Sequence, residues 1–124
     1  RPLIMGVTIL TSSTQAGIEE IGITCGLGEQ VSKLARIAAD CGLDGVVASP
    51  QEVSAIRRTV VNPEFLTVTP GIRPISATLD DQKRVTTFGQ ALANGSDYVV
   101  IGRPITKAKD RFAAVDDILS EVGH

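Results

Sequence analysis

Two short stretches decide how this chain folds: FLTVTPGIRP at residues 65–74 and DYVVIGRP at residues 97–104. Each begins with a β-branched, apolar run suited to a buried parallel strand, and each run stops at a glycine with an arginine and a proline close behind. Glycine lets the backbone approach a ligand closely, and the arginine guanidinium presents a planar set of donors that fits phosphate or carboxylate. Pro104 stands where a helix would begin, at a position that needs no amide hydrogen. Two strand ends that each carry a cation predict an anion pocket, most simply one for phosphate.

This arrangement is typical of the barrel that is built from eight β/α units. In that fold the ligand lies at the carboxyl ends of the strands, and phosphate is held by the loops after strands 7 and 8 and by a helix N-terminus. In the simpler alternative, both arginines only cap exposed loops. We call each of these strand ends, with its glycine and arginine, a corner. Because two such corners occur one helical unit apart, we favour the anion pocket over that alternative.

Composition indicates an ordinary globular chain and excludes several classes of function. The 124 residues suffice for one domain or part of one, and 43% of them are hydrophobic. The 12 basic and 14 acidic residues give a net charge of −2, so there is no basic excess that would favour nucleic acid. The chain has three Phe, one Tyr and no Trp, which leaves no aromatic platform for stacking bases. No apolar run approaches the ~20 residues that span a bilayer, and we expect a cytoplasmic protein.

The cysteine and histidine content argues against a metal centre. Cys25 and Cys41 lie sixteen positions apart, and the single histidine is His124. A zinc site needs three or four such ligands, so we expect no metal. The two cysteines are expected to be free and buried, although a disulfide stays possible in principle.

Apolar runs and amphipathic segments alternate along the chain. The predicted strands cover residues 3–10, 44–49, 65–69 and 98–101, and the predicted helices cover residues 16–21, 29–40, 50–60, 84–93 and 105–122. The last helix is expected to turn Ala108, Phe112, Val115 and Leu119 inward. A polar segment from Arg73 to Gln82 is longer than the usual connection, which itself hints at function. The pattern is that of an α/β protein with four β/α units.

Four β/α units allow either a small doubly wound sheet or half of a (β/α)8 barrel. A dinucleotide fold would place Gly-x-Gly-x-x-Gly after its first strand, but Thr-Ser-Ser-Thr follows Leu10. Gly26 and Gly28 follow no predicted strand and lack the third glycine. The two phosphate corners favour the barrel.

The chain resembles the orotidine 5′-phosphate decarboxylase family. The resemblance is carried by VTPGIRP at 68–74, DQKR at 81–84 and GSDYVVIGRPIT at 95–106, with VTILTS at 7–12 and CGLDGVV at 41–47 in the same order. It covers nearly the whole chain and implies a (β/α)8 TIM barrel, of which residues 1–124 supply the C-terminal half with strands five to eight and the phosphate-binding loops. It also implies a small nucleotide as the ligand. Because a half-barrel leaves open edges at residues 3–10 and 98–101, we expect a homodimer or association with the other half of the barrel.

The resemblance assigns roles to six residues. Arg103 and the Gly102 amide are expected to bind the 5′-phosphate. Arg73 is expected at the phosphate end of the loop after the seventh strand, and Pro70 is expected to shape that loop. Gln82 is expected to bridge phosphate and pyrimidine. Thr11 resembles a threonine that touches the ligand, although Thr11 and Gln82 could also be ordinary polar loop residues.

One departure from the family concerns the chemistry. The family's cofactor-free reaction depends on an array of lysines and aspartates that includes a D-x-K-x-x-D motif. The only approach to it here, at Asp81, has Thr86 in place of the second aspartate. We therefore predict no catalytic residue in this chain, which alone should be inactive. Two alternatives stay open: a non-catalytic phosphate-binding half-barrel, and a related sugar-phosphate decarboxylase or lyase, against which Gln82 argues.

Overall fold

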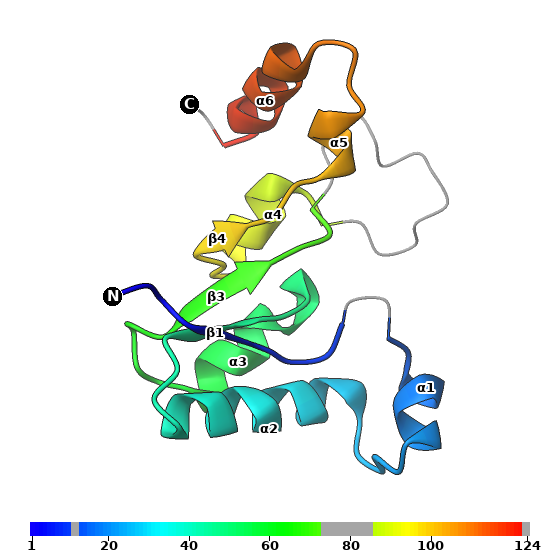
Figure 1. Cartoon of the computed structure of the whole chain (residues 1–124), viewed down its shortest axis with the longest axis vertical. Coiled ribbons are helices and arrows are strands. Elements are labelled where there is room, and N and C mark those ends of the chain that lie inside the picture. Colours follow the sequence, from blue (N-terminus) through cyan, green and yellow to red (C-terminus); the bar gives the residue numbers. More distant parts are fainter. Residues whose placement is uncertain (11–12, 73–85, 123–124) are drawn as a thin grey trace.

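A computed structural model describes residues 1–10, 13–72 and 86–122 of the chain. Its centre is a parallel sheet of four short strands, β1 (Met5–Val7), β2 (Gly45–Val47), β3 (Leu66–Thr69) and β4 (Tyr98–Val99). The strands lie in the order β1-β2-β3-β4, so each pairs with the next one along the chain (Figure 1). A doubly wound sheet reverses its strand order at a switch point. The sequential order of the described strands therefore rules out that alternative.

Helices connect the strands. The helical elements are α1 (Gln15–Glu20), α2 (Leu27–Asp40), the 3₁₀ turn η1 (Pro50–Glu52), α3 (Val53–Thr59), α4 (Phe88–Ala93), α5 (Arg103–Thr106) and α6 (Arg111–Ser120). Figure 1 shows α2 and α3 below the sheet, while α5 and α6 extend above β4. A right-handed crossover between successive parallel strands places its helix on the same side each time, which is the arrangement of a barrel wall.

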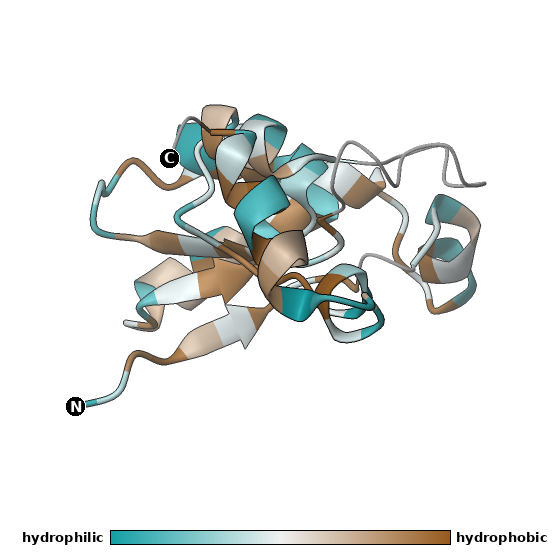
Figure 2. Cartoon of the chain, turned by 90° about the horizontal axis from the view of Figure 1, so that it is seen from above, coloured by the Kyte–Doolittle hydropathy of each residue, from teal (hydrophilic) through white to brown (hydrophobic). Residues whose placement is uncertain are grey.

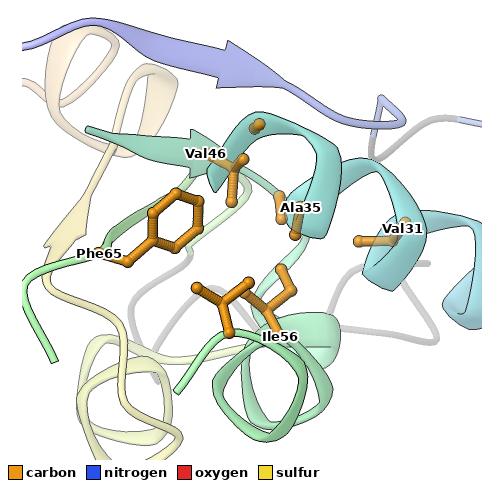
Figure 3. Packing of buried hydrophobic residues seen from close by; sticks show 8 residues of the cluster. Val31, Ala35, Val46, Ile56 and Phe65 are labelled. Carbon is orange, nitrogen blue, oxygen red and sulfur yellow. The ribbon is translucent and has the colours of Figure 1, made fainter. Parts of the chain in front are cut away.

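The main core lies between β2 and the helices α2 and α3. Figure 3 shows Val46 of β2 pointing toward Val31 and Ala35 of α2 and toward Ile56 of α3, with Phe65 beside them. These five side chains are at most 3% exposed. Burying a Val, Ile or Phe side chain stabilises a fold by about 1.5–3 kcal/mol. This cluster therefore holds α2 and α3 against the sheet. Apolar residues run along the strands in Figure 2.

The amphipathic pattern of residues 29–40 correctly predicted α2, which buries Val31, Ala35 and Ala38. The strands are shorter than the apolar runs that predicted them, since the ladder of β1 begins only at Met5 and that of β4 ends at Val99. Residues 84–85 of the predicted fourth helix lie outside the described residues, and the helix itself begins at Phe88, capped by Thr87.

The prediction of one long final helix over residues 105–122 was wrong. The chain forms α5, stops at Lys107, and starts α6 afresh where the Asp110 side chain accepts a hydrogen bond from the Ala113 amide. The inner face was also wrong, because Phe112 is 86% exposed and Ile118 is the residue that α6 buries. Because the helix is interrupted, the side chains of α6 do not point in the directions that they would take in one continuous helix.

Candidate functional site

The first predicted corner follows β3. Thr69 ends the strand with its side chain fully buried, Pro70 is half-buried, and Gly71 is exposed with φ +77°. That backbone conformation favours glycine, because a Cβ is strained there. Among the described residues, none has an atom within 4 Å of a Cβ built on Gly71, its chain neighbours aside.

The second predicted corner follows β4 directly beside the first. The Val100 amide donates to the Thr69 carbonyl over 2.9 Å, which keeps the two chains paired up to the last residue before Pro70. Gly102 then caps α5, and its carbonyl accepts from the amides of Ile105 and Thr106. Arg103 and Pro104 are the first two residues of α5, which begins two residues before the predicted helix, and Arg103 is exposed.

The structure therefore brings Pro70, Gly102 and Arg103 to neighbouring strand ends. Arg73, Gln82 and Thr11 lie outside the described residues. The first two belong to the segment 73–85, whose described neighbours Ile72 and Thr86 form a parallel backbone bridge and are both buried. In the sequence, Thr11 stands between the described residues Leu10 and Ser13; β1, which precedes them, lies on the opposite edge of the sheet from β4.

Sequence reasoning missed a small pocket at the carboxyl ends of β1 and β2. Its walls come from the ends of both strands, from the start of α2 and from η1: Ile9, Leu10, Ser13, Leu27, Val31, Ser49, Gln51 and Glu52. The Glu52 carboxylate lies over the first turn of α2, where a Cβ on Gly28 would come within 3.0 Å of it. An anion there complements the helix dipole. The signal in the sequence was Ser49-Pro50-Gln51-Glu52 directly after a strand.

Charge differs between the two ends of the sheet. Beyond the carboxyl end of β4, the exposed cations Arg103, Lys107, Lys109 and Arg111 follow one another within nine residues. At the amino ends, cations are paired instead: Arg57 with Asp97, and Arg1 with Asp44 over 3.0 Å.

The fold lowers the pKa of the Asp44 carboxyl. Hydrogen bonds from the Arg1 guanidinium, then from the Ile4 amide, hold the pKa of the Asp44 carboxyl below its usual range. The pKa of Arg1 is raised by the same pair. Both groups lie at the amino end of the sheet, away from the two corners.

Within residues 1–10, 13–72 and 86–122, no cluster of three or more His, Cys, Asp or Glu side chains could hold a metal ion. In the same part of the chain, no helix is long and apolar enough to cross a membrane. Cys25 and Cys41 are free thiols, but Cys25 is only half-buried and Cys41 is exposed, where burial was the expectation.

Known proteins match this chain over almost its whole length. Residues 1–118 match the model of the orotidine 5′-phosphate decarboxylase / HUMPS family. Orotidine 5′-phosphate decarboxylase of Trichlorobacter lovleyi is 51% identical over 98% of this chain and 50% of its own length, and that of Syntrophus aciditrophicus is 52% identical over 98% and 48%. The crystal structure of orotidine 5′-phosphate decarboxylase from Lactobacillus acidophilus superimposes with a TM-score of 0.80 at 37% identity, covering 99% of this chain and 50% of that one.

The chain thus spans about half the length of the curated relatives it matches. Its sequential parallel sheet and its likeness to the Lactobacillus structure establish the fold as about four β/α units of a (β/α)8 barrel. On the family match over residues 1–118 and on these identities, the chain belongs to the orotidine 5′-phosphate decarboxylase / HUMPS family.

Proposed function

We propose that this sequence is the phosphate-binding half of a cofactor-independent orotidine 5′-phosphate decarboxylase, which converts orotidine 5′-phosphate to UMP and CO₂ in pyrimidine biosynthesis. The observation that carries the proposal is the pairing of the two glycine corners. The Val100–Thr69 hydrogen bond sets Pro70 and Gly102–Arg103 side by side at the carboxyl edge of the sheet. The names of the curated relatives support the decarboxylase over a sugar-phosphate enzyme or a non-catalytic module.

The phosphate site contributes to catalysis although it does not contact the bond that breaks. In the family, the bond that breaks joins the pyrimidine ring to its carboxylate, and a lysine of the D-x-K-x-x-D array supplies the proton to the ring carbon. Binding energy from the distant phosphate holds and orients the ring, which raises the rate of that step. Because the array is missing from these residues, we expect the 124-residue chain alone to turn over no orotidine 5′-phosphate.

Within this proposal, Arg103 and the Gly102 amide bind the 5′-phosphate, Arg73 and Pro70 complete the first corner, and Gln82 and Thr11 contact the nucleotide. The substrate is a small nucleotide. The homodimer, the association with the other half of the barrel and the cytoplasmic location stay predictions.

The test removes the Arg103 guanidinium in a complete barrel that carries this sequence. Each hydrogen bond between a guanidinium and phosphate contributes about 1.5–3 kcal/mol, so Arg103→Ala should weaken UMP binding by about tenfold or more. Uridine, which lacks the phosphate, should bind almost unchanged. Arg111→Ala, at another exposed arginine beyond β4, is the matched control and should alter neither affinity. Equal losses for UMP and uridine in Arg103→Ala would place the phosphate elsewhere.

A further inference from the structure

Only a short backbone contact joins β3 and β4, although the proposed function requires that contact to hold the two corners at a fixed distance. β4 has two residues in the ladder, and the Asp97 and Val100 amides extend it by bonds of 3.2 and 2.9 Å to the carbonyls of Thr67 and Thr69. A shift of two residues along β3 would carry Gly102 and Arg103 about 7 Å past Pro70, since a strand rises ~3.3 Å per residue. Whatever fixes the register of β4 therefore fixes the distance between the two corners.

A pair of buried hydroxyls lies at the end of this ladder. Thr69 is fully buried and Ser96 is 6% exposed, and their hydroxyl oxygens are 2.8 Å apart. Both hydroxyls also lie near the Tyr98 carbonyl, at 2.9 Å from the Ser96 oxygen and 3.5 Å from the Thr69 oxygen, so one of them donates to the other while its partner's proton can engage this carbonyl. The Ser96 amide donates to the Ala91 carbonyl at the end of α4. Ser96 thus connects β3 and β4 through its hydroxyl and α4 through its amide.

This pair selects one register out of several. Apolar residues in a parallel ladder tolerate a slip of two positions, because the same face stays buried. The Thr69 and Ser96 hydroxyls do not tolerate such a slip. It would separate them and leave a buried donor and acceptor unpaired, which costs folding free energy. A second polar contact acts at the start of β4, where the Thr67 amide donates to the Asp97 carboxylate over 2.8 Å. Arg57 also donates there to Asp97 and to the Gly95 carbonyl. Of these contacts, the Thr69–Ser96 pair is the one adjacent to Pro70.

We infer that Thr69 and Ser96 are positioning residues that set the separation of the two phosphate-binding corners. They act through the register of β4 on β3 and do not touch the ligand themselves. This inference rests on the proposed function, because it assumes that Arg103 and the corner after β3 hold one phosphate.

The experiment uses a complete barrel carrying this sequence and measures the dissociation constants of UMP and uridine. The ratio of the two constants isolates the phosphate contribution. Thr69→Val keeps the shape and removes the hydroxyl, and Ser96→Ala removes the partner. Each should reduce the preference for UMP over uridine by about three- to tenfold, the effect of one misplaced hydrogen bond. Uridine affinity should stay unchanged, and Thr69→Ser should keep the wild-type preference.

Two further variants separate positioning from general stability. Thr59→Val removes a half-buried hydroxyl that bonds the Ala55 carbonyl on α3, and it should leave the preference unchanged even where it lowers the melting temperature. In an Arg103→Ala background, Thr69→Val should have little further effect, because both changes act on the same contact.

The possible failures are distinct. A wild-type barrel with no preference for UMP over uridine would overturn the proposed function. A wild-type preference that survives in folded Thr69→Val or in folded Ser96→Ala would overturn the positioning role alone. The Ser96 variant, the smaller change, decides the matter if Thr69→Val does not fold.

Discussion

The guanidinium of Arg57 donates to the carboxylate of Asp97 across the amino end of β3. Arg57 belongs to α3, and the same guanidinium also donates to the Phe65 carbonyl and, over 3.0 Å, to the Gly95 carbonyl. The Asp97 carboxylate in turn accepts from the Thr67 amide. One side chain therefore ties α3 to the starts of both β3 and β4, opposite the end where the two glycine corners lie.

We expect Arg57→Met to destabilise the fold by about 1–2 kcal/mol. It keeps much of the aliphatic stem but leaves Asp97 and two carbonyls without their charged donor, and each such bond contributes up to about 1.5–3 kcal/mol when buried. The lower figure follows from partial exposure, since the side chains of Arg57 and Asp97 are 26% and 33% exposed. Urea unfolding monitored by circular dichroism measures the change.

Arg58→Met is the matched control, because Arg58 is the exposed neighbour on the same helix. It should change the free energy of unfolding by no more than about 0.5 kcal/mol. Equal effects at positions 57 and 58 would mean that the Arg57 contacts do not support the sheet.

Much of the fold could be predicted from periodicity. The β-branched run at 65–69 and the amphipathic run at 29–40 are strong local signals, and they became β3 and α2. The glycine corners were visible as well, because strand, glycine and arginine follow one another within a few residues. Local sequence carries these features directly.

Features that depend on contacts between distant residues could not be predicted in this way. Lys107-Ala108-Lys109 is compatible with a helix, so these residues did not predict that the helix would stop and that Asp110 would cap a second helix. Thr69 and Ser96 lie 27 positions apart, and their contact exists only once the register of β4 is known. Phe112 fitted a helical stripe, but which face is buried depends on what packs against α6.

We expect stability to fall at low pH partly through Asp44. Because the folded state lowers the pKa of this carboxyl below the ordinary value of 3.8, the ionised form stabilises the fold. That contribution is complete above the ordinary value and is lost as the pH falls through the lower, folded pKa. Asp44→Asn should therefore destabilise the protein at neutral pH and flatten the pH dependence of the melting temperature below about pH 4.

The matched control for Asp44 is Asp40→Asn, a change to an exposed aspartate at the end of α2. This variant should follow the wild-type pH profile. A wild-type slope that persists in Asp44→Asn would assign the acid sensitivity to other carboxyls.

We expect opposite effects from alanine at two glycines. Gly71→Ala should cost about 1–2 kcal/mol, because Gly71 has φ +77° and a Cβ is strained there even where no described residue crowds it. Gly89→Ala should stabilise by about 0.5–1 kcal/mol, because Gly89 lies within α4 and its Cβ would make ordinary contacts, 3.6 Å from the Glu121 carbonyl oxygen. Chemical denaturation of the two variants side by side measures both signs, and a stabilising Gly71→Ala would contradict the strained corner.

The face of the sheet that is turned away from the helices predicts self-association of the isolated chain. A Cβ on Gly6 would contact the Ala38 and Leu43 side chains, so Gly6 faces the helices and its neighbour Val7 faces the other side. The register places Val7 in one row with Val47, Val68 and Tyr98. In a closed barrel such a row is packed against the opposite strands.

In this chain Val7 is 63% exposed and Tyr98 55%, and both lie on edge strands with unpaired backbone groups. Light scattering over a concentration series should therefore show species heavier than the 13.0 kDa chain. Val7→Asp should shift the distribution toward the monomer, because a carboxylate on this face opposes its burial. Val61→Asp is the matched control, since Val61 is 82% exposed in the connection between α3 and β3, and it should leave association unchanged. A wild-type chain that stays monomeric at every concentration and unfolds cooperatively would contradict this prediction, because the open face would then need no partner.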